Sequence, residues 1–163
     1  MKKIPEIYFE KCSASLSNFC FSLCRNNPDS EDLFQDTWIK AIEHIEKYDE
    51  TQPFERWLFK VCANTYKNSC RSAIRRKAVI FKTNEDKDAF FALIEDKNTF
   101  TDSHFDLINA IEMLPVKYKI IITLKYSRDF TEKEISEILV IPEGTVKSRL
   151  YKARSLLKRR LET

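Results

Sequence analysis

Glycine is almost missing from this sequence, which contains one glycine and five prolines among 163 residues. Apolar residues recur every three to four positions and no alternating segment of useful length occurs, so we predict an all-α fold. No run of eighteen apolar residues is present, which argues against a membrane-spanning helix. The first residues, MKKIPEIYFEKC, also lack the apolar stretch and cleavage site of a signal peptide. We therefore expect a cytoplasmic protein that is not inserted in a membrane.

Sequence motifs of catalysis and metal binding are lacking as well. There is no Ser/His/Asp constellation, phosphate-binding glycine loop or HExxH motif, so neither an enzyme nor a bound cofactor is expected. The cysteines form no CxxC pair, and in a cytoplasmic chain they are expected to be small buried thiols; they are Cys12, Cys20, Cys24, Cys62 and Cys70. Cys20 and Cys24, four positions apart, leave a zinc site as an alternative, but we predict no metal site.

The charge of the chain is unevenly distributed along the sequence. The net charge is only +3. Residues 29–50 hold eight acids and two lysines, whereas residues 55–77 hold seven bases and one acid. An acidic segment follows at 82–106, and residues 143–163 carry seven Lys or Arg against two Glu. Two separate basic segments predict two contacts with nucleic acid, and the acidic segments predict a surface for a positively charged partner.

The C-terminal segment has the pattern of a helix-turn-helix. Thr131 is followed three positions later by Glu134, which is the spacing of a capping box at the start of a helix. Pro142 lacks an N–H and therefore suits the first turn of a second helix, next to Gly144. The buried face of the first helix is predicted to consist of Ile135, Ile138 and Leu139.

The second helix of this motif has two unlike faces. One face is apolar, with Val146, Leu150, Ala153, Leu157 and Leu161 at helical spacing. Another face carries Lys147, Tyr151, Arg154 and Lys158. A helix-turn-helix places the start of its second helix in the major groove, where Lys and Arg suit phosphates and guanine edges. The motif therefore predicts DNA binding rather than a merely solvated basic helix.

The N-terminal half predicts two further helices separated by a short break at 48–54. The first would be capped by Asp29 or Ser30, with a core face of Phe34, Trp38, Ala41, Ile42 and Ile45. The second would run from 55 to 77 and end in a basic cluster. We interpret Trp38 and Trp57 as core residues. The alternative is that aromatic and basic side chains of this region stack on an opened DNA strand.

These motifs resemble those of the sigma-70 family. Residues 29–77, with DLFQD and WLFKVCANTYK, resemble region 2, and residues 106–161, with PEGTVKSRLYKAR, resemble region 4. The direct linkage of the two regions in a short chain is similar to the extracytoplasmic-function (ECF) group. The resemblance implies two small helical domains, region 2 at 1–77 and region 4 at 106–163, joined by a flexible linker at 78–105.

The resemblance also implies a function, that of a subunit that directs core RNA polymerase to promoters and melts their −10 element. In region 2, docking on the β′ clamp helices would involve Asp32, Gln35 and Asp36. Contact with the −10 element would involve Tyr48, Phe54, Asn64, Arg71 and Arg75.

In region 4, contact with the −35 element would involve Lys147, Ser148, Arg149, Tyr151, Lys152 and Arg154. Of these, Arg149 and Arg154 are expected on phosphates or in helix packing. The implied partners are core polymerase, including its β flap, promoter DNA and an anti-sigma factor.

One departure and two alternatives accompany this interpretation. The family often has glycine in the helix-turn-helix turn, where this chain has Val140, and a β-branched residue resists positive φ. We therefore expect the turn to differ, or Leu139 and Val140 to avoid that region. The alternatives are a stand-alone helix-turn-helix regulator that does not need polymerase, and a decoy that binds polymerase without opening promoters.

Overall fold

Helices make up nearly all of the chain that the structure describes. The computed structural model describes residues 2–80 and 103–162, in which no strand occurs. The elements are α1 (Glu6–Cys24), α2 (Asn27–Glu43), the 3-10 turn η1 (Ile45–Lys47), α3 (Phe54–Ile80), α5 (Ser103–Glu112), α6 (Val116–Tyr126), α7 (Glu132–Leu139) and α8 (Glu143–Glu162). The predicted all-α fold is confirmed.

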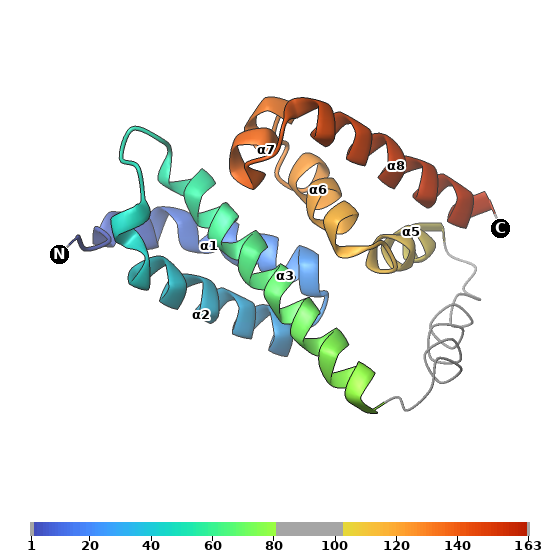
Figure 1. The fold of residues 1–163 in the computed structure, drawn as a ribbon, viewed down its shortest axis with the longest axis horizontal. Helices are drawn as coiled ribbons and strands as arrows, with labels where there is room; N and C mark the ends of the chain where they lie inside the picture. Colours follow the sequence, from blue (N-terminus) through green and yellow to red (C-terminus); the bar gives the residue numbers. More distant parts are fainter. Residues whose placement is uncertain (1, 81–102, 163) are drawn as a thin grey trace.

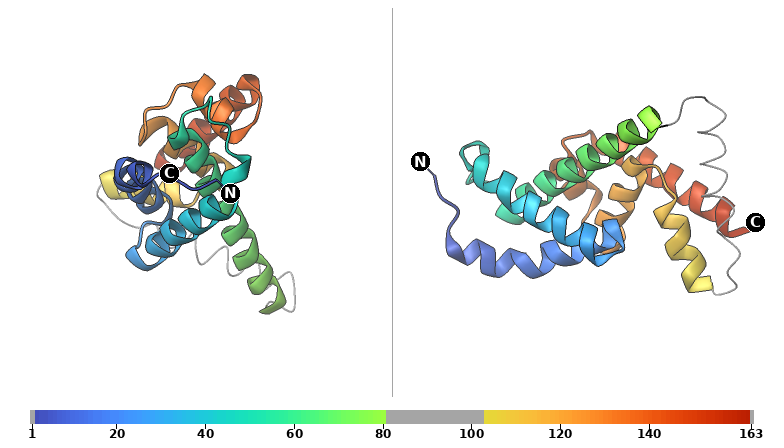
Figure 2. Two further views of the ribbon diagram at one scale, coloured as in Figure 1. Left: turned by 90° about the vertical axis from the view of Figure 1, so that its left-hand side faces the viewer. Right: turned by 90° about the horizontal axis from the view of Figure 1, so that it is seen from below.

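The helices form two groups that pack on one another (Figure 1). Helices α1 to α3 make the N-terminal domain, and α5 to α8 make the C-terminal domain, whose α6 and α7 lie against α3. The start of α1 and the end of α8 lie at opposite ends of the long axis (Figures 1 and 2). Most of the predicted linker at 78–105 lies outside the described residues, and α3 and α5 extend helical structure a few residues into its two ends.

Helix α2 begins earlier than the sequence analysis expected. Its cap is Asn26, whose side-chain oxygen accepts a hydrogen bond from the backbone N–H of Asp29 at 2.9 Å. Pro28 stands in the first turn, where its missing N–H costs nothing. The expected caps Asp29 and Ser30 therefore lie inside the helix, and that prediction was wrong.

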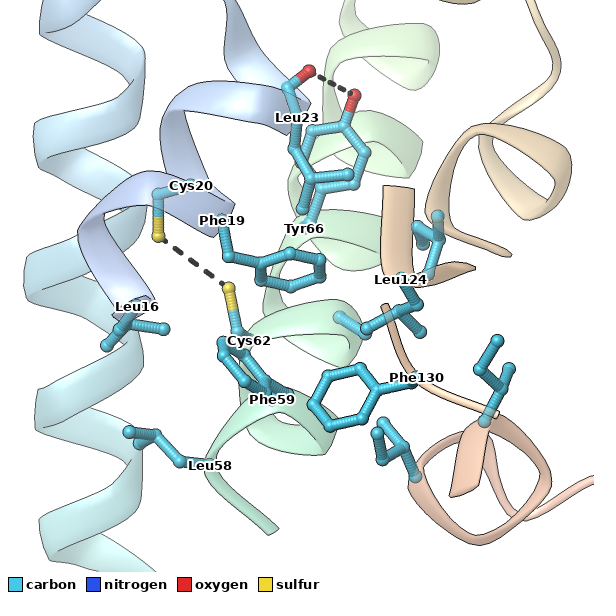
Figure 3. Close-up of a cluster of buried hydrophobic side chains, with 14 of the residues drawn as sticks. Leu16, Phe19, Cys20, Leu23, Leu58, Phe59, Cys62, Tyr66, Leu124 and Phe130 are labelled. Atoms are coloured by element: carbon cyan, nitrogen blue, oxygen red, sulfur yellow. Dashed lines mark hydrogen bonds between the residues drawn. The ribbon is translucent and has the colours of Figure 1, made fainter. Parts of the chain in front are cut away.

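A single apolar core runs from the N-terminal domain into the C-terminal domain (Figure 3). Phe59 of α3 is completely buried at its centre. Its ring lies 4.9 Å from that of Phe19 on α1 and 5.7 Å from that of Phe130, both edge to face. Each edge-to-face pair of rings stabilises the fold by about 0.5–1.5 kcal/mol beyond the effect of burying their apolar surface. The two domains are therefore joined by packing and not only by the chain.

The predicted core residues of α2 are mostly buried, with one exception. Trp38, Ala41 and Ile45 belong to the core, and Phe34 packs against it. Ile42, however, is 54% exposed, because it lies about 100° around the helix from the buried Ala41 and shares a face with Ile39, which is 52% exposed. The assignment of Ile42 to the core was wrong.

The five cysteines are free thiols, and most of them are buried between α1 and α3. The sulfur atoms of Cys20 and Cys62 lie 3.7 Å apart in the core (Figure 3). Burial raises the pKa of Cys12, and burial raises the pKa of Cys24 from 9.0 to about 12. These thiols are held in the protonated form, in which they pack as small apolar groups.

The raised pKa of Cys24 predicts a loss of stability at alkaline pH. Above pH 9 the unfolded chain releases this proton while the folded protein keeps it, so the contribution is complete below pH 9 and is lost towards pH 12. We expect Cys24→Ala to reduce the dependence of the unfolding free energy on pH by up to about 1.4 kcal/mol per pH unit in that window. Urea denaturation from about pH 8 to pH 11 measures it. Ser22→Ala is the control, and equal slopes for the two variants would contradict the prediction.

The turn of the helix-turn-helix places Val140 in the left-handed region, with φ 55° and ψ 51°. Its N–H donates to the carbonyl of Ser136 and closes α7. The N–H of Ile141 donates to the same carbonyl at 3.2 Å, and the Ser136 hydroxyl donates back to the carbonyl of Ile141. The expectation that Val140 avoids positive φ was wrong, because these three hydrogen bonds fix the turn despite the β-branched side chain.

Substituting this valine is expected to stabilise the protein. A non-glycine residue in the left-handed conformation costs about 1–2 kcal/mol, and Val140 is 67% exposed, so little burial is lost with its side chain. Glycine adds about 0.5–1 kcal/mol of unfolded-state entropy, which leaves a gain of about 0.5–1 kcal/mol for Val140→Gly. Thermal unfolding should show a higher midpoint. Val140→Ala keeps a Cβ and should gain less; a lower midpoint for the glycine variant would refute the argument.

Candidate nucleic-acid interface

A cleft of about 560 Å³ opens between the loop after η1 and one side of α3. Its walls combine aromatic rings, amides and cations, which are the groups that stack on bases, bind their edges and bind phosphates. The lining residues from α2 and η1 are Lys40, His44 and Lys47; those from the loop are Tyr48, Asp49 and Gln52; those from α3 include Arg56, Trp57, Lys60, Asn64 and Asn68; and α7 adds Glu137.

The loop at the mouth of the cleft is held in one shape by its own hydrogen bonds. The Tyr48 hydroxyl donates to the carbonyl of Gln52 at 2.6 Å. The backbone N–H and the hydroxyl of Thr51 donate to Asp49 Oδ1 at 3.0 and 2.7 Å, and these bonds lower the pKa of Asp49. A loop fixed in this way loses little entropy when it binds a ligand.

Two of the residues predicted at the −10 element, Tyr48 and Phe54, pack in the core next to this loop. Phe54 is 4% exposed and its ring stacks on that of Tyr8 at 4.4 Å. The ring of Tyr48 is also buried, against Phe54 and Trp57, although it still lines the cleft. Phe54 thus packs beneath the loop and does not line the cleft, whereas Tyr48 does; the contact of both residues with the −10 element stays a prediction.

The other three predicted −10 residues share one exposed face of α3. Asn64, Arg71 and Arg75 are separated by seven and four positions, so they lie in one row along the helix. Asn64 lines the cleft, and the row leads from it along about 16 Å of helix at 1.5 Å per residue. Lys60 and Asn68, one turn to either side of Asn64, line the cleft too. The sequence analysis missed them, although their spacing of four from Asn64 was visible.

A lysine of α3, Lys67, lies near the recognition helix α8 of the other domain. Burial lowers the pKa of Lys67, and the positive charges of Arg149 on α8 and of Arg71 lower it further. Positive charges of the two domains therefore lie close to one another at Lys67.

The residues predicted to dock on polymerase are exposed on the outer face of α2. Asp32, Gln35 and Asp36 lie in its first half, and the exposed apolar side chains of Ile39 and Ile42 continue the same face. An acidic patch followed by unpartnered apolar side chains is typical of a protein-binding surface.

The predicted −35 residues divide into two sets on α8. Lys147, Ser148, Tyr151 and Lys152 are exposed, whereas Arg149 is half-buried. Arg154 donates from Nε to the hydroxyl of Tyr126 at 2.7 Å, and its guanidinium lies 5.6 Å from the centre of the same ring. This contact of Arg154 with Tyr126 of α6 corresponds to the helix-packing alternative that the sequence analysis gave for this arginine.

An apolar groove of about 600 Å³ lies beside Arg154, between α5, α6 and α8. Its apolar lining is contributed by Leu107 and Ile111 of α5, Ile122 and Tyr126 of α6, and Leu157 and Leu161 of α8. The sequence analysis assigned Leu157 and Leu161 to a packed face and did not predict the groove.

Among the described helices none is long and apolar enough to cross a membrane.

Two helical domains, one with a cleft lined by basic side chains and the other with a basic helix-turn-helix, are typical of a DNA-binding protein. Comparison with known proteins agrees with this class. Residues 8–76 match sigma-70 region 2, and residues 104–157 match sigma-70 region 4.

Individual proteins give the same result along nearly the whole chain. The chain is 29% identical to the ECF RNA polymerase sigma factor SigW of Bacillus subtilis (strain 168), over 97% of this chain and 87% of that protein. It is 30% identical to the RNA polymerase sigma factor SigV of the same strain, over 85% and 79%. The chain belongs to the sigma-70 family, and within it to the ECF sigma factors.

A solved structure supports the fold independently. The sigma factor RpoE of Bartonella quintana, in a co-crystal with the anti-sigma factor NepR, is similar with a TM-score of 0.69. The similarity covers 97% of this chain and 96% of that one at 22% identity. The two-domain helical architecture is therefore shared with that protein.

Proposed function

We propose that this protein directs core RNA polymerase to a specific set of promoters by three contacts of its own. The acidic and apolar face of α2 docks on the β′ clamp helices. The cleft and the basic row of α3 hold the −10 element, and the exposed start of α8 reads the −35 element. The cleft is the observation that carries this proposal, because a stand-alone operator-binding protein has no use for a preformed site lined by rings, amides and cations.

The cleft suits an unpaired base better than a duplex. A flipped base needs a ring to stack on and polar groups for its edge, and here Trp57, Asn64 and Gln52 offer both. Extracting a base costs a few kcal/mol, which binding in the cleft can offset without a fuel molecule. Arg71 and Arg75 then bind the phosphates of the neighbouring nucleotides.

In region 4 we assign base contacts to Lys147, Ser148, Tyr151 and Lys152, and phosphate contact to Arg149. The apolar groove between α5, α6 and α8 is large enough for the apolar face of a helix, and we assign it to the β flap of polymerase. A similar sigma factor is known in a co-crystal with an anti-sigma factor, and we propose a regulator of that kind for this chain as well. The protein would then work in the cytoplasm, where polymerase meets promoter DNA.

The test is transcription by purified core polymerase that lacks any sigma factor. The protein is added, and the transcripts made from fragmented DNA of the source organism are sequenced. A defined set of start sites with shared −10 and −35 sequences is the expected result. Binding to core without specific starts would favour a decoy, and a DNA footprint of the protein alone, with no effect on polymerase, would favour a stand-alone regulator.

A further inference from the structure

Arg56 lies where the two domains meet and where the cleft opens. It belongs to the first turn of α3 and lines the cleft. Its Nη1 donates to Glu137 Oε2 at 2.6 Å, and its Nη2 lies 3.6 Å from Glu134 Oε2. Both carboxylates belong to α7, the first helix of the helix-turn-helix. Region 4 therefore neutralises a cation that stands in the region 2 cleft.

Glu137 also lines the cleft itself. The strongly basic side chains around it are Lys40, Lys47, Arg56 and Lys60, which suit the phosphates of a nucleic acid strand. A carboxylate at that position repels a phosphate and occupies the guanidinium that would bind it. Arginine binds carboxylate and phosphate through the same fork of N–H donors, so one ligand displaces the other.

We propose that Arg56 is a phosphate-binding residue of the cleft, and that Glu137 and Glu134 compete with DNA for it. Packing of α7 on α3 and binding of a single DNA strand then exclude each other. This inference rests on the proposed function, because it takes the ligand of the cleft to be an unpaired DNA strand. It adds Arg56 to the DNA-binding residues. It also gives the contact between the domains a role, which is to control the access of a DNA strand to the cleft.

The distance between the two promoter elements requires α7 to leave α3 when both elements are bound. Elements at −10 and −35 lie about 25 base pairs apart, which is about 85 Å at 3.4 Å per base pair. A compact chain of this length has a radius of gyration of about 15 Å. Helix α8 cannot reach the −35 element while α7 is held on α3. Release of α7 frees Arg56 at the moment when a phosphate becomes available to replace the carboxylates.

Binding of the full-length protein to a single-stranded DNA tests the proposal. The probe is a fluorescein-labelled oligonucleotide of mixed sequence, followed by anisotropy at low salt. We expect Glu137→Gln to bind about three- to fivefold more tightly than the wild type, which is the range for a partly exposed ion pair. Arg56→Gln should bind no more tightly than the wild type, and the double variant should bind less tightly than Glu137→Gln, because it lacks the guanidinium that binds the phosphate. If Arg56 only held the two domains together and bound no phosphate, Arg56→Gln would tighten binding as Glu137→Gln does, and the proposal would be overturned.

Glu132→Gln is the matched control, because it makes the same change of charge on the same helix at a residue that does not line the cleft. Its affinity should stay near that of the wild type. A phosphate contact also has a signature in salt dependence. The slope of log K against log salt should be smaller by about 0.7 in the double variant than in Glu137→Gln. Equal slopes would show that Arg56 binds no phosphate.

Transcription with core polymerase separates this inference from the proposed function. If the wild type initiates at specific promoters but Glu137→Gln binds the oligonucleotide as Glu132→Gln does, the inference fails alone. If the wild type does not initiate while the variants behave as expected, the competition at Arg56 holds and the assignment to a −10 element fails.

Discussion

Replacing Phe59 by alanine is expected to lower the free energy of unfolding by about 3–5 kcal/mol. The ring is completely buried and touches Phe19 on α1 and Phe130 ahead of α7 (Figure 3). The guanidinium of Arg128 lies 5.4 Å from its centre, and the same arginine pairs with Glu55 at 3.0 Å. Truncation leaves a cavity that no single helix can fill, because the contacts come from both domains.

Urea denaturation of the full-length protein measures this loss as a shift of the midpoint. Phe21→Ala is the matched control, since it makes the same chemical change at a ring on α1 that is 44% exposed. It should cost much less. If the two variants lost similar stability, the shared core of Figure 3 would not be the packing that holds the protein together.

The two helices of the helix-turn-helix could be predicted from sequence because their signals are local. The hydroxyl of Thr131 accepts from the N–H of Glu134 at 3.1 Å, as the capping box requires, and α7 and α8 follow at the predicted positions. Sequence alone did not settle the cap of α2, because Asn26, Asp29 and Ser30 are all suitable caps. Pro28 is compatible with the cap at Asn26, since proline is accommodated in the first turn of a helix, but it excludes neither of the other two.

The cleft could be predicted only in part. Asn64 was identified from the resemblance, but Lys40 and Lys47 reach the same space from α2 and η1. No periodicity along the chain relates those positions to α3, because their proximity results from the packing of the domain. The contact between the domains could not be predicted either, because Arg56 and Glu137 are 81 residues apart in the sequence and no local pattern relates them.

Val140 illustrates how the hydrogen bonds of a helix end override the steric preference of one residue. Steric preference argues against a positive φ for valine, and the cost is about 1–2 kcal/mol. The hydrogen bonds that join Ser136 to Val140 and Ile141 outweigh it.

Reversing the charge of Asp36 is expected to weaken binding to core polymerase by about thirtyfold or more. Loss of one partner of an interfacial charge pair costs about 2–5 kcal/mol, and Asp36→Lys adds repulsion from the positive charge that the acidic face is proposed to meet. Asp36 is exposed on α2, so the unfolding free energy should change by no more than about 0.5 kcal/mol. Titration of the labelled protein with core polymerase measures the affinity.

Glu10→Lys provides the matched control, because it makes an equivalent change of charge at an exposed position of α1, outside the proposed face. If both variants bound core equally well, the α2 face would not be the docking surface. The apolar part of the face gives an independent check: Ile39 is 52% exposed, so its side chain contributes little to the stability of the free protein. Ile39→Ser should therefore weaken core binding without lowering the unfolding midpoint, whereas Asp36→Lys should also make the affinity less dependent on salt, because an electrostatic attraction has been removed.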